Sequence, residues 1–187
     1  MSSSVDSIVD TDDDAVEAYL AAVVPKGFIF KPTDKELVLE YLTKKILNQP
    51  LPPSRIKSVN IYEYNPEALI DKYKEYGKNE WYFFTPRAKR YPNGSRPNRT
   101  AGDGYWKATV AETKIYRGKI DRTVIGLKKT LVFHYGKPPN GLKTNWIMHE
   151  FVASDQITTA AATNVMNNNT RTTTNNSKKN SCFPRKI

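Results

Sequence analysis

Cysteine is almost absent from this sequence, and its scarcity excludes several kinds of protein. Cys182 is the only cysteine, so no disulfide can form within the chain, which is typical of proteins of the cytosol or nucleus. His134 and His149 are the only histidines, and the sequence has no CxxC or HxxxH pattern. Because a structural zinc site needs four ligands, usually Cys and His, we expect no metal site.

Long apolar runs and common catalytic motifs are also missing. No hydrophobic stretch approaches the roughly 18–20 residues of a membrane span, and the first residues lack the basic flank and apolar core of a secretory signal. No glycine-rich phosphate loop, nucleophile motif or carboxylate cluster occurs in the basic half of the chain. The sequence therefore predicts a protein that is not an enzyme, with no cofactor, no small-molecule substrate and no membrane partner.

Both ends of the chain lack what a folded core requires. Residues 1–24 contain six acidic residues and no basic one, which predicts an acidic, disordered leader over 1–23 with at most a short helix near 15–23. Residues 154–187 are rich in Thr, Ala and Asn and cannot bury enough apolar surface to order themselves. We therefore expect one folded domain over residues 24–153, followed by a disordered tail over 154–187.

Positive charge is concentrated in one part of the chain. Residues 86–143, the basic segment, contain fourteen Lys and Arg residues against three acidic ones, although the whole chain has a net charge of only +10. Aromatic residues lie among these charges, as in WYFF at 81–84 and YWK at 105–107. Since each phosphate that a cation neutralises releases condensed counterions, the pattern favours nucleic-acid binding over a merely solvated basic surface.

Two helices are expected before the basic segment. Residues 33–36 read TDKE, a capping box that begins a helix whose apolar residues follow helical spacing until Pro50. A second helix is expected to begin at Asn65-Pro66, with Asn65 as its cap and Pro66 as its first residue. Its inner face is expected to consist of Ala68, Leu69 and Tyr73.

Strands and short turns follow these helices. Strands are expected at 81–84, 105–110, 112–116, 122–134 and 143–153. Asn93-Gly94 is a strong signal for a hairpin turn between two of them. Short turns allow only antiparallel pairing of successive strands, so the sequence predicts an antiparallel sheet.

The expected strand 105–110 has residues suited to reading a duplex. Alternation places Trp106, Ala108 and Val110 toward the core and Tyr105, Lys107 and Thr109 outward. Lys and Thr can contact base edges and thymine methyls in a major groove about 12 Å wide. The nearby cations are expected to hold phosphates, which sets affinity without reading sequence; they are Arg99, Arg96, Lys89, Arg90, Lys128 and Lys129. The aromatic octapeptide of RNA-recognition modules is missing, which favours duplex DNA.

Three blocks of the sequence resemble those of plant NAC transcription factors, in the family's order. VPKGFIFKPTDKEL at 24–37 is similar to the family's opening block, and the others are EWYFFTPRAKRYPNGSRPNRTAGDGYWKAT at 80–109 and KKTLVFHYGKPPNGLKTNWIMHEF at 128–151. The resemblance implies a fold that is mainly β with flanking α, a twisted antiparallel sheet flanked by a few helices. It also implies a nuclear, sequence-specific regulator of transcription that binds double-stranded DNA through the WKAT strand.

The resemblance further implies a dimer, either a homodimer or a heterodimer with other NAC proteins. The residues expected at its interface are Val24, Pro25, Phe28, Ile29 and Glu36. In the family an arginine at the position of Ile29 pairs with the partner's glutamate at the position of Glu36. Glu36 is retained here, but the capping box explains it without a partner. An exposed ion pair contributes only ~0–1 kcal/mol, so the isoleucine leaves dimerisation as the expectation.

A second departure from the family supports an alternative interpretation. Val110 stands where the family has the glycine that ends WKATG, and valine prefers regular strand geometry where glycine permits close approach to DNA. The residues after 153 are also few and contain few acidic or bulky apolar side chains. The alternative is therefore a short partner that forms heterodimers with full-length relatives and titrates or represses them.

Overall fold

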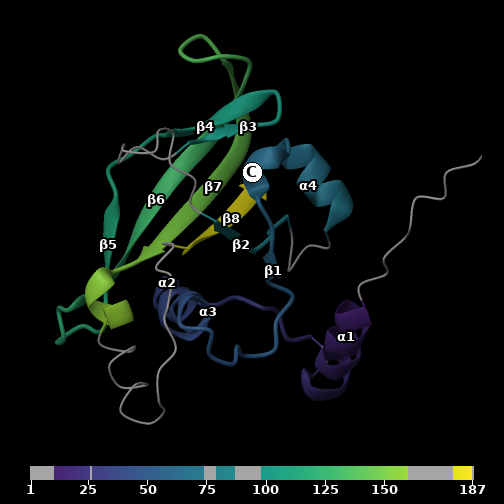
Figure 1. Cartoon of the computed structure of the whole chain (residues 1–187), viewed down its shortest axis with the longest axis vertical. Coiled ribbons are helices and arrows are strands. Elements are labelled where there is room, and N and C mark those ends of the chain that lie inside the picture. The colour runs from purple at the N-terminus through teal and green to yellow at the C-terminus, as the bar shows by residue number, and fades with distance from the viewer. Residues whose placement is uncertain (1–10, 26, 74–78, 87–97, 160–178, 187) are drawn as a thin grey trace, which may run out of the picture.

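The central feature of the protein is an eight-stranded β-sheet (Figure 1). The computed structural model describes residues 11–25, 27–73, 79–86, 98–159 and 179–186. The strands are β1 (Lys57–Ser58), β2 (Phe83–Pro86), β3 (Thr100–Ala101), β4 (Gly104–Ala108), β5 (Thr113–Tyr116), β6 (Val124–Tyr135), β7 (Leu142–Ala153) and β8 (Lys179–Lys186). Their order is β1-β2-β8-β7-β6-β4-β3, and β5 also pairs with β6. Every pair is antiparallel except β1 with β2, which confirms the predicted fold class.

Helical segments pack on both faces of this sheet. They are α1 (Thr11–Val23), α2 (Asp34–Glu36), the π-helical turn η1 (Leu37–Thr43), α3 (Lys44–Ile46), the 3₁₀ turn η2 (Ile61–Glu63) and α4 (Pro66–Lys72). No helix in the described part of the chain combines the length and the apolar composition that a membrane crossing requires.

Hairpin β6–β7 separates two hydrophobic cores. Met148 belongs to a core that includes Leu69 of α4, and Phe151 belongs to a core that includes Val38 and Leu42 of η1. Because successive side chains of a strand point to opposite faces, Met148 and Phe151 place these cores on opposite sides of the sheet. The sheet is therefore covered by α4 on one face and by the segment α2-η1-α3 on the other.

The helix that begins after Thr33 confirms the predicted capping box. The backbone N–H and the hydroxyl of Thr33 donate to Oε2 of Glu36 at 2.7 and 2.8 Å, and the Glu36 N–H donates to the Thr33 hydroxyl at 3.3 Å. The helix then widens into the π-helical turn η1, which the sequence did not predict. The buried Thr43 hydroxyl donates to the carbonyl of Val38, five residues earlier, at 2.8 Å, which matches the wider spacing of a π-helix.

The second helix begins at Pro66 with Asn65 at its N-cap position, as predicted, but the predicted inner face was wrong at Ala68. Asn65 has the extended backbone of an N-cap residue, yet its side chain makes no capping hydrogen bond and instead contacts Asp103. Ala68 is exposed, whereas Leu69 is buried. The side chain of Asn65 hydrogen-bonds to a turn 38 residues away instead of to its own helix. Spacing in the sequence does not reveal such a contact.

Strand β2 begins two residues later than predicted. Phe83 and Phe84 pair with Lys57 and Ser58 of β1, so the strand runs from Phe83 to Pro86. Trp81 is buried just before it, and its indole N–H donates to the carbonyl of Tyr73 at 3.0 Å. This contact with the end of α4 takes Trp81 out of the sheet. The predicted Asn93-Gly94 turn lies outside the described residues.

The prediction of disorder does not hold for residues 179–186. These residues form β8, which lies between β2 and β7 and pairs with both, as in Phe84 with Ser181 and Ser181 with Phe151. Pro184 pairs with Met148 where β8 has β7 as its only neighbour, a position that tolerates the missing N–H of proline. The composition of the tail concealed this strand, because β8 reads KNSCFPRK and contains neither a run of β-branched residues nor a regular apolar alternation.

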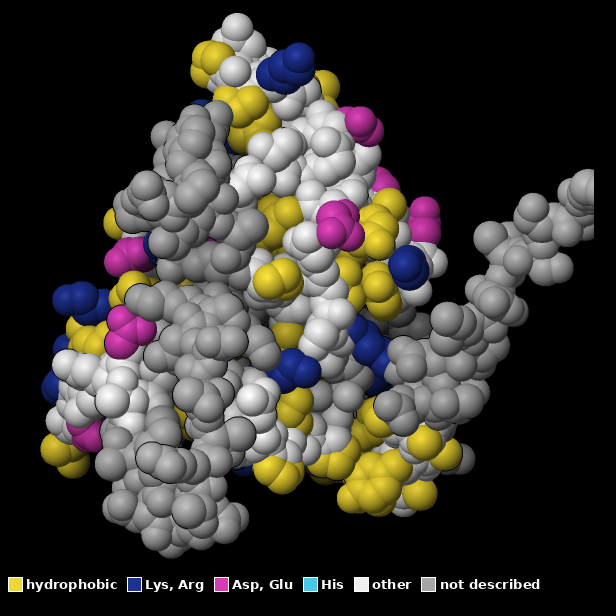
Figure 2. All heavy atoms as spheres, viewed as in Figure 1, with side chains coloured by type: hydrophobic (Ala, Val, Ile, Leu, Met, Phe, Trp, Pro, Cys, Tyr) yellow, Lys and Arg dark blue, Asp and Glu magenta, His cyan; other side chains and the backbone are white. Residues whose placement is uncertain are grey.

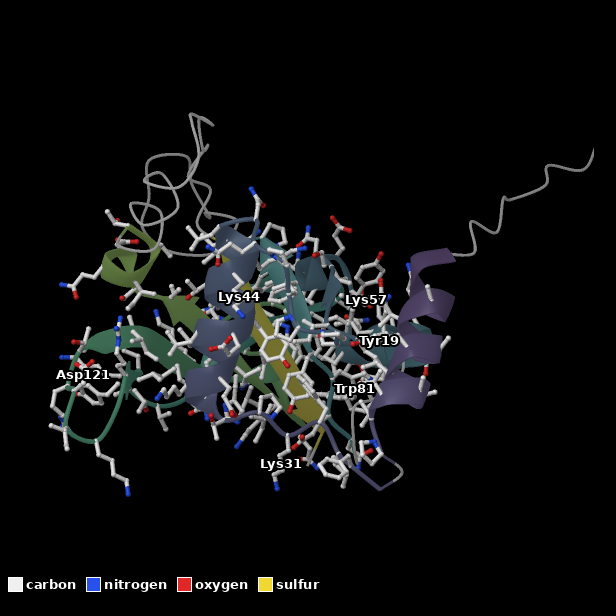
Figure 3. The ribbon with its side chains drawn as sticks, turned by 90° about the horizontal axis from the view of Figure 1, so that it is seen from below. Tyr19, Lys31, Lys44, Lys57, Trp81 and Asp121 are labelled. Atoms are coloured by element: carbon white, nitrogen blue, oxygen red, sulfur yellow. The ribbon has the colours of Figure 1, made fainter. Side chains whose placement is uncertain are left out.

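At the other end of the chain, residues Thr11–Val23 form α1, longer than the short helix that the sequence suggested. Figures 1 and 3 both place α1 at one side of the molecule, where Tyr19 is labelled in Figure 3, opposite the turn of Asp121 between β5 and β6. The positions of residues 1–10 and the domain boundaries at 24 and 153 stay predictions.

Candidate nucleic-acid interface

Strand β4 exposes a different set of residues from the one that alternation predicted. Trp106 is buried in the same core as Phe133, as expected, but Ala108 is exposed and Val110 is 62% exposed. Tyr105, which was predicted to point outward, is buried. Period-two alternation fails because neither Ala108 nor Val110 belongs to a hydrophobic core, so the buried part of this strand ends at Trp106.

Tyr105 is covered by the neighbouring hairpin. Its ring stacks on His134 with centroids 5.3 Å apart, and its hydroxyl donates to the carbonyl of Pro139 at 3.3 Å. His134 in turn lies within hydrogen-bonding distance of the Val132 carbonyl, 3.1 Å from Nδ1. His134 and His149 both lie within strands of the sheet, in β6 and β7.

Lys107 and Thr109 lie at an open edge of the sheet. On one side β4 pairs with β6, with Lys107 opposite Val132, and the Thr109 N–H donates to the Thr130 carbonyl at 3.0 Å. Among the described residues, β4 pairs on its other side with β3 alone, at Gly104 and Tyr105. Both Lys107 and Thr109 are exposed, and Lys107 forms no ion pair with an acid of the described residues. This edge can therefore approach a large partner without displacing a strand.

Arg99, a predicted phosphate contact, is held by a buried carboxylate. Its Nη2 lies 2.8 Å from Oε2 of Glu150, and their side chains are 20% and 2% exposed. Nε of Arg99 is buried without a hydrogen-bond partner, as is Nε1 of Trp106 on the neighbouring strand. The Arg99 carbonyl also accepts from the Trp106 N–H at 2.8 Å. The sequence contained a signal for this pair, because alternation places Glu150 on the same face as the buried Met148.

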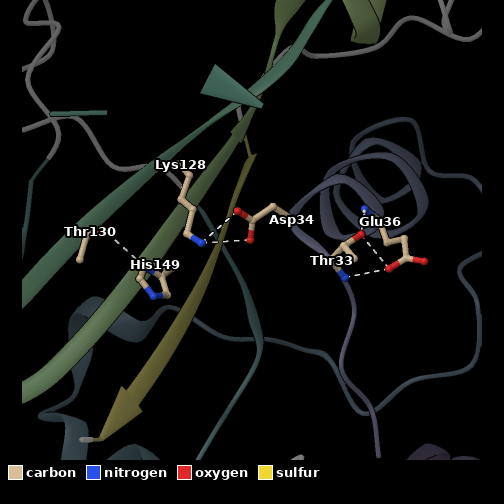
Figure 4. A network of polar contacts seen from close by, with 6 residues as sticks. All are labelled: Thr33, Asp34, Glu36, Lys128, Thr130 and His149. Atoms are coloured by element: carbon tan, nitrogen blue, oxygen red, sulfur yellow. Dashed lines mark hydrogen bonds and ion pairs between the residues drawn. The ribbon is translucent and has the colours of Figure 1, made fainter. Parts of the chain in front are cut away.

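The two predicted cations of β6 are also paired. Nζ of Lys128 lies 3.0 Å from both carboxylate oxygens of Asp34 in α2, as Figure 4 shows beside the capping box. Lys129, on the opposite face, lies 3.0 Å from Glu112. Figure 4 also shows Thr130 and His149 in contact across the hairpin, with 3.3 Å between the hydroxyl and Nδ1. Lys89, Arg90 and Arg96 lie outside the described residues.

A carboxylate of α4 ties this helix to the hairpin β6–β7. Oε2 of Glu67 accepts from the Tyr135 hydroxyl at 2.7 Å, and Oε1 accepts from the indole N–H of Trp146 at 2.5 Å. The hydrogen bond to Glu67, followed by burial, raises the pKa of Tyr135 to about 12. A carboxylate accepting from two rings fixes the position of α4 against the sheet.

Replacing Tyr135 by phenylalanine should therefore reduce the fall in unfolding free energy as the pH rises above 10. Folding raises the pKa of this phenol from 10 to about 12, so its contribution is fully present below pH 10 and is lost as the pH rises toward 12. Urea unfolding at about pH 8 and about pH 11 measures the change in unfolding free energy. An equal change in both proteins would contradict this role of Tyr135.

The predicted dimer residues form an exposed apolar surface next to α1. Phe28 and Ile29 are 74% and 70% exposed, and Val24 and Pro25 are also exposed. Tyr19 and Val23 of α1 extend this surface, which Figure 2 shows as hydrophobic side chains gathered at the lower right. Glu36 is committed to the capping box, and its hydrogen bonds with Thr33, backbone first, hold the pKa of its carboxyl below the usual value.

Among the residues that the structure describes, no group of three or more His, Cys, Asp or Glu side chains has a geometry that could hold a metal ion. The described interface therefore consists of cations, hydroxyls and backbone groups at a sheet edge, together with the apolar surface near α1. Such groups bind and position a partner.

Comparison with known proteins identifies the family. The model of the family described as No apical meristem (NAM) protein matches residues 25–153, which is most of the chain. NAC transcription factor 32 of Arabidopsis thaliana is 56% identical over 131 residues, which cover 70% of this chain and 50% of the relative. NAC transcription factor ONAC010 of Oryza sativa subsp. indica is 51% identical over 135 residues, 72% of this chain and 32% of the relative.

A third relative, NAC domain-containing protein 2 of Solanum lycopersicum, is 50% identical over 135 residues, which cover 72% of this chain and 48% of the relative. The chain therefore belongs to the NAC-domain family, as the motifs predicted. It spans half or less of the length of these three relatives.

Proposed function

We propose that this protein is a nuclear, sequence-specific DNA-binding regulator of transcription that binds double-stranded DNA as a dimer and needs no cofactor. The observation that carries the proposal is the open edge of β4, where exposed Lys107 and Thr109 lie within the basic segment. Membership of a family whose relatives are named transcription factors supports the same conclusion. A strand edge with Lys and Thr is suited to the major groove, where base edges differ.

The ion pairs of the interface suggest how the other cations take part. Lys128 and Lys129 each face an acid that is about half exposed, Asp34 and Glu112. A phosphate can replace such a carboxylate at little cost, because exposed ion pairs contribute only ~0–1 kcal/mol. Arg99 differs because Glu150 is buried, so its guanidinium keeps a fixed position while its exposed part faces a phosphate. We therefore assign Lys107 and Thr109 to base contacts and the other cations to phosphates.

Replacing Lys107 by alanine should flatten sequence preference. A base-edge contact contributes on the order of 1–3 kcal/mol of discrimination, so affinity for a selected site should fall while affinity for random duplex changes little. Lys143→Ala is the matched control, because it removes the same charge from an exposed position of the basic segment on β7. Titrations of the selected and random duplexes at fixed salt measure the ratio of the two affinities for each variant.

The salt dependence of the same titrations tests the phosphate contacts. Log affinity should fall with log salt with a slope near −0.9 for each phosphate neutralised. A slope near zero would refute DNA binding, and equal losses of Lys107→Ala on both duplexes would refute the reading role of Lys107. A dimer that binds no duplex would instead support the titrating partner, to which the exposed Val110 in place of glycine pointed.

The dimer is proposed to form through the apolar surface around Phe28 and Ile29. Phe28→Ser should weaken self-association by about ten-fold or more, since burying an aromatic ring of this size contributes a few kcal/mol. Ile120→Ser is the matched control, because Ile120 is 97% exposed in the turn between β5 and β6, away from α1. Sedimentation equilibrium measures the dissociation constants, and equal values for the two variants would contradict the proposed interface.

A further inference from the structure

Hairpin β3–β4 connects the two parts of the proposed DNA-binding surface. Strand β3 consists of Thr100 and Ala101, pairs only with β4 and forms one end of the sheet path. Arg99 precedes it, and Lys107 lies on β4. An edge strand of two residues with a single neighbour is held weakly by its own ladder, so other contacts must fix its position.

The turn of this hairpin is bound by the side chain of Asn65. Oδ1 of Asn65 accepts from the backbone N–H of Asp103 at 2.8 Å, and Nδ2 donates to the Asp103 carboxylate at 2.9 Å. The two residues are 38 positions apart, and Asn65 stands at the start of α4. The amide of Asn65 therefore binds both a donor and an acceptor of Asp103. This arrangement fixes the orientation of the Asn65 side chain.

The rest of the turn is adapted to this contact. Gly102 has φ +52, and a Cβ atom there would lie 2.2 Å from Oδ1 of Asn65, so only glycine permits the approach. The Asp103 carbonyl accepts from the N–H of Gly136 in the turn after β6 at 2.8 Å. The turn is thus clamped between α4 and the hairpin β6–β7, and Glu67 fixes α4 to that same hairpin.

We infer that Asn65 is the positioning residue of the DNA-binding surface, acting through the turn of Gly102 and Asp103 on β3 and Arg99. The inference rests on the proposed function for its effect on DNA. Strand β4 pairs with β6 at five positions, from Gly104 to Ala108, so the base-reading residues keep their place without Asn65. Strand β3 pairs with β4 at only two positions, although Ala101 is buried and Glu150 holds the Arg99 guanidinium. Loss of the clamp therefore acts on the backbone of β3 and Arg99, and through it on the phosphate contact.

The test compares Asn65→Ala with Asn60→Ala. Asn60 is a matched control because its side chain also donates to a carboxylate, that of Glu63 at 2.7 Å, but this partner lies in η2, three residues away, and not in the hairpin. Asn65→Ala should weaken binding to selected and random duplexes alike, by about ten-fold, as expected for one lost charge-assisted contact. The salt slope should fall in magnitude by about 0.9, which corresponds to one phosphate. Asn60→Ala should change neither quantity.

An exchange of donor and acceptor provides a rescue. N65D keeps an acceptor for the Asp103 N–H but places a second carboxylate beside Asp103, so it should lose affinity as Asn65→Ala does. The double variant N65D/D103N restores one carboxylate and one amide with reversed roles, and should recover affinity and salt slope to within about two-fold of the original protein. Thermal unfolding of each variant confirms that the comparisons are made between folded proteins.

Hydrogen exchange of the Trp106 amide tests the positioning role of Asn65 in the protein without DNA. That N–H donates to the Arg99 carbonyl, so it reports the attachment of Arg99 to β4. Its exchange should accelerate by about ten-fold or more in Asn65→Ala and not in Asn60→Ala. If the original protein binds no duplex, the proposed function fails while this exchange still decides the positioning role. Unchanged exchange, or an affinity loss confined to the selected duplex, would overturn the inference.

Discussion

Deleting residues 179–187 should abolish cooperative folding of the domain. Strand β8 lies inside the sheet, where Phe84 of β2 and Phe151 of β7 pair with the same residue, Ser181. Its removal deletes four register pairs with β2 and six with β7, and each lost backbone hydrogen bond contributes about 0.5–1.5 kcal/mol net. A loss over ten pairs is comparable with the whole ~5–15 kcal/mol of a typical domain. Circular dichroism during heating should show no cooperative transition.

Two further variants distinguish a missing strand from a merely shorter chain. Deleting residues 2–10, a similar length at the other end, should leave the transition in place. Ser181→Pro should lower the melting temperature strongly, because proline removes an N–H from a strand that has neighbours on both sides. If the shortened chain melts as the full chain does, β8 contributes nothing to the sheet.

Replacing Arg99 by alanine should destabilise the protein by about 2–4 kcal/mol, because removing one partner of a buried ion pair leaves the other charge unpaired. Glu150 is 2% exposed and would remain as a carboxylate without its cation, while the 20% exposure of Arg99 moderates the loss. Urea unfolding measures the free energy. A loss of DNA binding in Arg99→Ala can therefore arise from destabilisation of the folded protein as well as from a missing phosphate contact.

The matched control for this loss is the exposed pair of Arg117 and Asp121, whose side chains are each about half exposed. Arg117→Ala should cost less than about 1 kcal/mol. The double variant R99M/E150L should be less destabilised than the sum of its single changes, because it leaves no unpaired charge. Additive losses would show that Arg99 and Glu150 do not act on each other.

The sequence predicted the antiparallel sheet because its signals were local. The capping box at Thr33, the long strands β6 and β7 and the turn between them all depend on residues that are near one another in the chain. Helix α4 began where Asn65-Pro66 predicted for the same reason. The motif blocks identified the family, since their order and spacing are specific.

What the sequence did not predict depends on contacts between distant residues. The side chain of Asn65 binds Asp103 instead of capping its helix, and the sequence contains no pattern that joins these two positions. Ala108 and Val110 alternate with Trp106, but their burial depends on what covers that end of the sheet. Arg99 resembled a free cation because Glu150, its partner, lies on another strand. Residues 179–186 lack a regular apolar alternation, so the sequence did not predict a strand whose partners are β2 and β7.

The position of β8 has a consequence for the synthesis of the protein. Strand β8, the last strand among the described residues, occupies an interior place in the sheet, so a nascent chain cannot close the sheet until residue 186 has left the ribosome. Until then β2 and β7 present open edges that can pair with other nascent chains. Because pairing of Phe83 with Cys182 joins distant positions, closure is also expected to be slow. Chaperones that cover strand edges would therefore act on this protein mainly before β8 is made.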